Sequence, residues 1–339
     1  MTEKKYFIRC NSGLKIGIGH VMRCFSLAET LTDMKCKVNF ICEELEGNII
    51  HFLKEKNFEV FSIKNDNDVK QILKDNSNSS LIIDDYNIDE KFETIVRPYV
   101  KQIIVIDDLA NRKHNCDLLL DQNFSGKNID KYNNFIPKNC VRLFGPRFAL
   151  LRNEFLENRR VRNINFPVKN IFISYGGVDS TDETTKVLVA IKNLKNNNLK
   201  VNAIIGDSNI QREKIRDLCS LIPNVNFISK FDGISKIMNE SDLAFGAGGS
   251  SMWERMCLGV PSIVTITSED QINATEALSE NQYIINIGLA ENVSNKDYER
   301  ILNEISEKEL NEISKKSYEL VDGKGTRRSA EQIICLENS

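Results

Sequence analysis

Gly13-Leu14-Lys15-Ile16-Gly17-Ile18-Gly19-His20-Val21 is the stretch on which the predicted fold of this 339-residue chain depends. Residues 6–10 before it are mostly apolar and predict a short buried strand, and residues 21–31 after it carry apolar side chains at helical spacing. The stretch therefore predicts a glycine-rich loop between a strand and a helix. Because glycine has no Cβ, Gly17 and Gly19 permit a tight turn or the close approach of a ligand.

His20, at the entrance of this helix, is the candidate catalytic residue. The first N–H groups of a helix lack intrahelical partners, so the position favours anions and polar ligands. A positively charged imidazolium is disfavoured there, and we expect His20 to be neutral and able to act as a general base. The alternative is that His20 only caps the helix, because glycine loops between strands and helices are common.

Composition restricts the class of protein. The chain is 41% hydrophobic and 27% charged, as soluble globular proteins are, and its length suits two domains. The net charge of −3 gives no electrostatic reason to expect nucleic acid or an anionic membrane as a partner. The nine cysteines include no C-x-x-C pair, which favours reduced thiols and no metal site. With neither a signal peptide nor a membrane-spanning apolar run, we expect a cytoplasmic monomer without a cofactor.

Strand-like runs alternate with helical patterns, which is typical of a mostly parallel α/β sheet. The strands expected in the first half are 6–10, 38–42, 59–63, 81–84, 103–107, 118–120 and 141–144. Those expected in the second half are 170–175, 201–205, 225–228, 243–246, 262–266 and 283–287. We therefore predict a Rossmann-like N-terminal domain over 1–156, a polar linker over 157–168, a second Rossmann-like domain over 169–325, and a terminal helix over 326–339 that returns to the first domain.

Ligands of open α/β sheets bind beyond the carboxyl ends of the strands. Besides the opening loop, three loops at such ends are unusual: the Gly176-Gly177 loop, residues 246–255, and residues 267–271. We expect Gly176 and Gly177, together with Asp270 and Gln271, to contact the substrate.

Residues 246–255 contain the strongest candidate for phosphate binding. Gly248, Gly249, Ser250 and Ser251 expose successive backbone N–H groups and two hydroxyls, which suits a diphosphate without a metal. Glu254 lies one helical turn after Ser250, where it can accept hydrogen bonds from ribose hydroxyls. The alternative is that the glycines only permit close packing of the helix on the strand.

Acidic residues follow two further strands. Asp84-Asp85-Tyr86 and Asp107-Asp108 are expected at the same edge of the sheet, where Asp84 or Asp107 can orient His20 or bind sugar hydroxyls. Tyr86 can offer its hydroxyl to the substrate. Any one of these acids can equally cap the next helix, and a tyrosine at a strand end can equally be a packing residue. His51 and His114 are isolated in the sequence, and we leave both out of the site.

Several common site motifs are absent from the sequence. There is no G-x-G-x-x-G loop followed by an acid about twenty residues later, which disfavours a dinucleotide oxidoreductase. Neither a G-x-x-x-x-G-K-[ST] loop nor a G-x-S-x-G turn is present.

Five stretches together resemble a known family. Residues 16–24, 106–123, 145–152, 173–179 and 246–261 are similar, in the same order, to motifs of the UDP-2,4-diacetamido-2,4,6-trideoxy-β-L-altropyranose hydrolases of pseudaminic acid biosynthesis, the PseG family. The resemblance implies two Rossmann-like domains facing a cleft in a glycosyltransferase-B-like (GT-B-like) fold, related to MurG.

The resemblance also implies a reaction. UDP is expected on the C-terminal domain, and water is expected to attack the anomeric carbon without a metal. The family's catalytic histidine falls on His20, its substrate-contacting tyrosine on Tyr86 and its ribose-binding glutamate on Glu254.

One position departs from the family pattern. The family commonly has Glu-Asn-Gln where this chain has Glu269-Asp270-Gln271, and an aspartate cannot donate a hydrogen bond as an amide does. The departure affects the identity of the sugar more than the reaction. Two other functions are compatible with the same scaffold: a glycosyltransferase that uses a UDP-sugar donor, and a non-catalytic nucleotide-sugar-binding protein.

Overall fold

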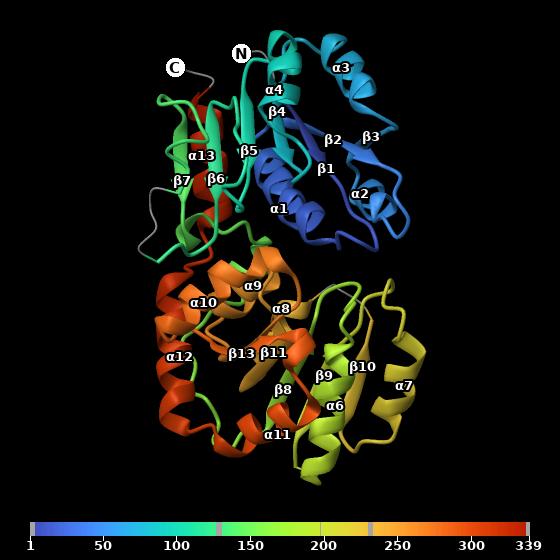
Figure 1. Cartoon of the computed structure of the whole chain (residues 1–339), viewed down its shortest axis with the longest axis vertical. Helices are drawn as coiled ribbons and strands as arrows, with labels where there is room; N and C mark the ends of the chain where they lie inside the picture. The colour runs from blue at the N-terminus through green and yellow to red at the C-terminus, as the bar shows by residue number, and fades with distance from the viewer. Residues whose placement is uncertain (1–3, 127–130, 197, 230–232, 337–339) are drawn as a thin grey trace. The chain divides into compact units, whose positions relative to one another are not determined.

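The chain folds into two compact units, each built on one parallel sheet (Figure 1). The computed structural model describes residues 4–126, 131–196, 198–229 and 233–336. The first unit comprises residues 1–152 and 324–339, and the second comprises residues 153–323. Residues 157–168, expected as a linker, thus belong to the second unit, and residues 337–339 of the expected terminal helix lie outside the described residues.

The described part of the first unit contains a seven-stranded sheet of order β3-β2-β1-β4-β5-β6-β7, with all neighbours parallel. Its strands are β1 (Lys5–Cys10), β2 (Lys37–Glu43), β3 (Glu59–Ile63), β4 (Ser80–Asp84), β5 (Ile103–Ile106), β6 (Leu118–Asp121) and β7 (Val141–Phe144). Each lies within one residue of its predicted range. Short runs of Ile, Val, Leu and Phe are typical of strands covered on both faces, which explains the agreement.

Helices cover both faces of this sheet. They are α1 (Gly19–Asp33), α2 (Ile50–Glu55), α3 (Asp66–Lys74), α4 (Glu90–Val96) and α13 (Gly325–Leu336), with short 3₁₀ turns η1 (Arg97–Tyr99) and η2 (Pro146–Phe148). One apolar core joins the sheet to α1, α2 and α13, and a second joins its other face to α3 and α4.

The terminal helix α13 is anchored in the first unit. Ala330 and Ile333 are fully buried in the core that contains Leu27 of α1. At the start of the helix, the Thr326 hydroxyl oxygen accepts a hydrogen bond from the Leu151 N–H at 2.7 Å and donates to the Leu151 carbonyl at 2.8 Å.

The described part of the second unit has a six-stranded parallel sheet of order β10-β9-β8-β11-β12-β13. Its strands are β8 (Asn170–Ser174), β9 (Lys200–Ile204), β10 (Val225–Ile228), β11 (Leu243–Ala247), β12 (Ser262–Ile266) and β13 (Ile285–Leu289). Its helical elements are α5 (Asn153–Glu157), α6 (Glu183–Leu194), α7 (Arg212–Ser220), α8 (Ile234–Asn239), α9 (Ser251–Cys257), η3 (Glu269–Gln271), α10 (Ile272–Glu280), η4 (Ala290–Asn292), α11 (Asn295–Glu304) and α12 (Glu307–Leu320).

Both sheets reverse their strand order next to their first strand. In the first unit the reversal lies between β1 and β4, and in the second it lies between β8 and β11. Open α/β sheets bind ligands outside the carboxyl ends of the strands at such a switch point. His20 follows β1 and Asp84 ends β4, while Gly176 follows β8 and Gly248 follows β11. The topology therefore brings His20 and Asp84 to the switch point of the first unit, and Gly176 and Gly248 to that of the second.

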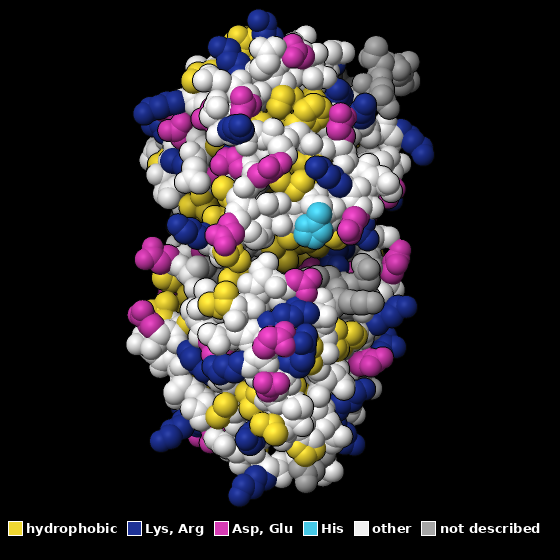
Figure 2. All heavy atoms as spheres, turned by 90° about the vertical axis from the view of Figure 1, so that its right-hand side faces the viewer, with side chains coloured by type: hydrophobic (Ala, Val, Ile, Leu, Met, Phe, Trp, Pro, Cys, Tyr) yellow, Lys and Arg dark blue, Asp and Glu magenta, His cyan; other side chains and the backbone are white. Residues whose placement is uncertain are grey.

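Charge is mixed over the surface of the molecule that Figure 2 shows, where basic and acidic side chains alternate without a large area of one sign. Among the described helices, none combines the length and the apolar character needed to cross a membrane.

Candidate active site

His20 and Asp84 form a hydrogen-bonded pair at the switch point of the first unit. His20 Nδ1 lies 2.6 Å from Asp84 Oδ1. The Asp84 side chain is 0% exposed, whereas 15% of the His20 side chain is exposed. The second ring nitrogen of His20, Nε2, has no hydrogen-bonding partner among the described residues, so it is free to meet a ligand. A histidine held by a carboxylate on one nitrogen and free on the other is the usual arrangement of a general base.

The pKa of His20 is shifted in the direction opposite to our expectation. Burial lowers the pKa of His20, but the carboxylate of Asp84 outweighs burial, and the net shift is upward. The expectation of a neutral histidine considered the start of α1 and omitted the buried acid beside it. A raised pKa makes His20 a stronger base, although it needs a higher pH to be deprotonated.

Arg23 supports the pair from one turn further along α1. Its Nε donates to Asp84 Oδ2 at 2.6 Å and its Nη2 donates to Asp84 Oδ1 at 2.7 Å, so the contact is bidentate. Burial raises the pKa of Asp84, but Arg23 and His20 outweigh burial and hold it well below its usual range. Asp84 is therefore a carboxylate at neutral pH, and its contact with Nδ1 fixes the orientation of the His20 ring.

Tyr86 lies against His20 with its hydroxyl already engaged. The two rings pack edge to face, with centroids 4.6 Å apart, and Tyr86 Oη donates to Asp108 Oδ1 at 2.5 Å. Burial, followed by the charge of Asp108, raises the pKa of the Tyr86 hydroxyl. The hydroxyl that we expected to meet the substrate thus donates to Asp108 in this structure, while its oxygen can still accept a hydrogen bond.

Asp107 faces the protein interior. Its carboxylate is fully buried, forms an ion pair with Arg112 Nη1 at 2.6 Å and accepts a hydrogen bond from Tyr132 Oη at 2.9 Å. We expected Asp107 to orient His20 or bind sugar hydroxyls, but these contacts instead make it a buried link between polypeptide segments. His114, which we left out of the site, is also buried, and its Nδ1 lies 2.6 Å from Glu93 Oε1.

The glycine loop of the second unit is tightly packed at two positions. A Cβ on Gly246 would lie 2.5 Å from Arg255 Nη1, and a Cβ on Gly248 would lie 2.3 Å from Thr275 Oγ1. A Cβ on Gly249 would meet nothing closer than Gln271 Nε2 at 3.7 Å. Close packing against Thr275 of α10 therefore explains Gly248, a contact different from the helix–strand packing of the alternative interpretation, whereas packing does not explain Gly249.

Arg255 lies behind the same loop. It is completely buried on α9, and its guanidinium donates to the Ala247 carbonyl at 2.8 Å, to Ser251 Oγ at 3.1 Å and to Ser262 Oγ at 3.1 Å. Burial lowers the pKa of Arg255 to about 10. The residue fixes the shape of the loop through the carbonyl and hydroxyl oxygens at its two ends.

Gln271 joins the glycine loop to the loop after β12. Its Oε1 accepts hydrogen bonds from the N–H groups of Gly248 at 3.0 Å and Thr267 at 3.1 Å. The Gln271 side chain, which we expected to contact the substrate, thus hydrogen-bonds to backbone N–H groups. Its neighbour Asp270 is exposed on η3.

Gly176 and Gly177 lie in the loop after β8. Gly176 has φ +83°, a conformation that glycine adopts without strain, and it is exposed. Gly177 is buried and packs tightly on Gly206. The contact is so close that a Cβ added to Gly206 would lie 2.2 Å from the Gly177 carbonyl oxygen. Ser250 and Glu254, at the start of α9 and one turn further, are half-buried.

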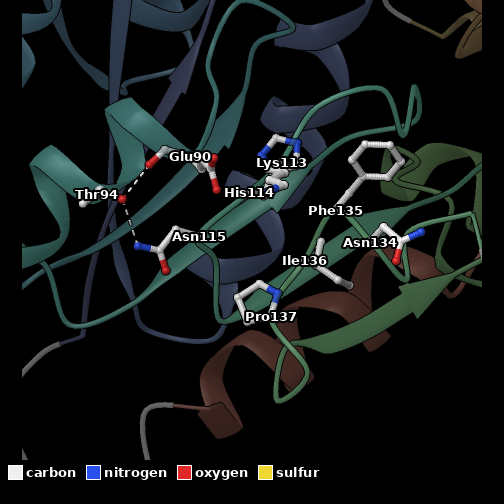
Figure 3. Close-up of a pocket in the computed structure, with 9 residues that line it drawn as sticks. All are labelled: Glu90, Thr94, Lys113, His114, Asn115, Asn134, Phe135, Ile136 and Pro137. Atoms are coloured by element: carbon white, nitrogen blue, oxygen red, sulfur yellow. Dashed lines mark hydrogen bonds between the residues drawn. The ribbon is translucent and has the colours of Figure 1, made fainter.

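A separate cavity of about 310 Å³ lies beside α4 in the first unit. Figure 3 shows Glu90 and Thr94 on one side of it and Phe135, Ile136 and Pro137 on the other. None of the residues predicted from the sequence for the site lines this cavity. Within the described ranges, no three His, Cys, Asp or Glu side chains cluster in a way that could hold a metal ion.

Sequence reasoning missed Arg23 as a member of the His20 network, and within the Asp107-Asp108 cluster it chose Asp107 as the site residue where the structure has Asp108. Arg23 follows His20 by three residues, a spacing that places two side chains on the same face of a helix, and this signal could have identified it. Asp108 was expected in the same acidic cluster as Asp107, at this edge of the sheet. No feature of the sequence indicates which of two adjacent aspartates points to the site.

The second half of the chain matches a known domain family. Residues 171–333 match the Glycosyltransferase family 28 C-terminal domain. The MurG structure of Acinetobacter baumannii is similar in fold, with a TM-score of 0.68 and 13% identity over 97% of this chain and 99% of that one. The Staphylococcus aureus MnaA–UDP co-structure gives a TM-score of 0.65 at 12% identity, over 99% of this chain and 97% of that one. The predicted GT-B-like fold of two Rossmann-like units is thereby confirmed.

Three relatives are similar in sequence. An uncharacterized protein of Methanocaldococcus jannaschii is 26% identical over 79% of this chain. The match spans only 56% of the length of that protein. A UDP-2,4-diacetamido-2,4,6-trideoxy-beta-L-altropyranose hydrolase of Campylobacter jejuni is 27% identical over 75% of this chain and 88% of that enzyme. The spore coat polysaccharide biosynthesis protein SpsG of Bacillus subtilis is 24% identical over 95% of each chain. The chain is thus a GT-B protein related to enzymes of nucleotide-sugar chemistry. Within that class its similarity is to PseG-like and SpsG-like proteins.

Proposed function

We propose that this protein hydrolyses a UDP-activated 2,4-diacetamido-2,4,6-trideoxyhexose of the altrose type in nonulosonic (pseudaminic) acid biosynthesis. Water attacks the anomeric carbon, the bond from that carbon to the diphosphate oxygen breaks, and UDP leaves. His20 takes the proton that the water loses. The free sugar and UDP are the products, so the atoms balance without a cofactor.

The His20–Asp84 pair is the observation that carries this proposal. The Nδ1–Oδ1 contact of 2.6 Å fixes the ring, and Nε2 is left for a proton-transfer partner. A positioned general base contributes roughly 10²–10⁴-fold in rate, which is the share of catalysis assigned to His20. The 27% identity to the Campylobacter jejuni hydrolase supports the choice of water as the nucleophile.

The leaving UDP is assigned to the second unit. The backbone of Gly249, Ser250 and Ser251 is proposed to bind the diphosphate, whose charge grows as the bond breaks. Glu254 is proposed to accept hydrogen bonds from ribose hydroxyls. The match of residues 171–333 to a glycosyltransferase C-terminal domain supports this division of roles.

The direct test is incubation of the purified protein with a panel of UDP-sugars in ¹⁸O-water, with EDTA and without an acceptor. Release of free sugar and UDP, with the label in the sugar, is the expected result. Label in UDP would show attack at phosphorus and would contradict the role given to the anomeric carbon. Turnover that stops with EDTA would contradict the metal-free reaction.

A glycosyltransferase is the second candidate, because the matched domain family is named for that activity. A transferase would release little sugar without an acceptor and would form a glycoside when one is supplied. Binding of UDP-sugars without turnover under either condition would instead indicate a binding protein.

A further inference from the structure

One guanidinium joins two carboxylates beside His20. Arg23, buried on α1, contacts both oxygens of Asp84 through Nε and Nη2, at 2.6 Å and 2.7 Å. Its remaining Nη1 donates to Asp108 Oδ2 at 2.9 Å. The planar fork of arginine has donors on three nitrogens, and here each nitrogen meets a carboxylate.

The two carboxylates in turn hold the two aromatic rings of the site. Asp84 Oδ1 lies 2.6 Å from His20 Nδ1, and Asp108 Oδ1 accepts the Tyr86 hydroxyl at 2.5 Å. Because the rings themselves pack edge to face at 4.6 Å, the imidazole is constrained at Nδ1 and on one side. Arg23 therefore contacts both of the acids that hold the two rings.

The charges around His20 oppose one another. Asp84 at the end of β4 and Asp108 after β5 favour its protonated form, while Arg23 on α1 opposes it; Tyr86, after β4, packs against the ring with a neutral hydroxyl. Arg23 Nη2 lies 3.2 Å from His20 Nδ1, close enough for the two cations to repel. Arginine keeps its proton at all ordinary pH values, so this opposition is permanent.

We propose that Arg23 is a positioning residue that holds Asp84 against His20 and Asp108 against Tyr86, and that its fixed charge opposes protonation of His20. Its importance for catalysis rests on the proposed function, since a base must be deprotonated to act. Without Arg23, two buried acids would surround the ring unopposed and would favour the imidazolium. With Arg23 in place, the His20 ring keeps its carboxylate partner, and it loses its proton more readily than it would without Arg23.

The titration of His20, followed by NMR, tests this proposal without any substrate. The chain has only three histidines, so labelled imidazole signals can be assigned with His51→Asn, an exposed position, and His20→Asn. Arg23→Gln should raise the midpoint of His20 by about one pH unit or more, the usual size for a neighbouring charge. A midpoint that is unchanged or lowered would overturn the proposal.

A second variant tests the same balance with Arg23 in place. Asp108→Asn removes a negative charge and leaves the bidentate contact with Asp84 intact, so the His20 midpoint should fall. A rise in this variant would contradict the proposal even if Arg23→Gln failed to fold. Thermal unfolding of each variant shows whether it is folded. Loss of structure alone would not shift the His20 titration midpoint upward in Arg23→Gln and downward in Asp108→Asn.

Arg23→Lys distinguishes charge from geometry. Lysine retains the charge but has no fork, so it should move the midpoint less than Arg23→Gln does. In a substrate-competent assay it should still lower kcat at least tenfold with little change in KM, because Asp84 is no longer held at two points. Wild-type kcat in this variant would overturn the positioning role. Failure of the wild-type protein to hydrolyse any UDP-sugar would refute the proposed function and leave the NMR result standing.

Discussion

His20 Nδ1 and Asp84 Oδ1 lie 2.6 Å apart, although 64 residues separate them in the chain. The contact exists because β1 and β4 are neighbours in the sheet, so the loop after one strand meets the end of the other. A buried carboxylate thus reaches a partly exposed histidine at the position where parallel sheets bind ligands.

Replacement of the histidine should abolish the reaction and spare nucleotide binding. His20→Asn removes the proton acceptor but none of the second-unit groups proposed to hold UDP. We expect kcat to fall by roughly 10²–10⁴-fold, the usual contribution of a general base. The Kd for UDP, measured by calorimetry, should stay within about twofold of wild type. Near-normal turnover would remove His20 from the mechanism.

The stability contributed by His20 should depend on pH with a defined sign. A histidine whose folded pKa is raised binds its proton more tightly in the folded than in the unfolded chain. That contribution is fully present below the unfolded pKa of about 6.5 and is lost as the pH rises through the raised folded value. Urea unfolding of wild type and His20→Asn at pH 5.5, 7 and 9 measures it. The wild type should lose its advantage as the pH increases, and a growing advantage would mean that the pKa is lowered.

The two central glycines of the second-unit loop should respond differently to alanine. Gly248→Ala places a Cβ 2.3 Å from buried Thr275 Oγ1, and such overpacking costs about 1–3 kcal/mol. Gly249→Ala meets only ordinary contacts and should unfold near the wild-type urea midpoint. It serves as the matched control for Gly248→Ala. UDP binding by Gly249→Ala then reports on close approach of the diphosphate, separate from packing.

Shortening a buried side chain of the terminal helix α13 should destabilise the first unit. Ile333 is fully buried in the core shared by α1 and α13, and Ile→Ala changes in such positions cost about 2–5 kcal/mol. Ile333→Ala should therefore lower the unfolding midpoint, whereas Glu331→Ala on the exposed side of the same helix should not. Proteolysis with peptide mapping would show whether the first unit opens before the second. Equal protection of both units in Ile333→Ala would contradict the assignment.

The strands could be predicted because each is a short apolar run between polar segments, and β1 to β7 lie within one residue of expectation. The fold class followed from their alternation with helices. The direction of the His20 pKa shift could not be predicted, because it depends on a carboxylate 64 residues away that enters the site only once β1 and β4 pair. Likewise, the packing role of Gly248 depends on Thr275, which α10 brings to the loop.

The separate roles of Asp107 and Asp108 also could not be predicted from the sequence. Asp107 and Asp108 are adjacent, yet one is enclosed by Arg112 and Tyr132 while the other holds Tyr86. Successive residues after a strand point in different directions, so neighbouring side chains of identical chemistry can have separate partners. For such pairs only the three-dimensional environment assigns a role.

The arrangement of the first unit from two separate segments has a consequence for biosynthesis. The ribosome makes residues 153–323 between residues 1–152 and α13, so the first segment of the first unit lacks one layer of its core while the whole second unit is being synthesised. Until that last helix arrives, the apolar surfaces of Leu27 and its neighbours have no cover. We therefore expect early intermediates of this protein to depend on chaperones through the exposed apolar surface of the first unit.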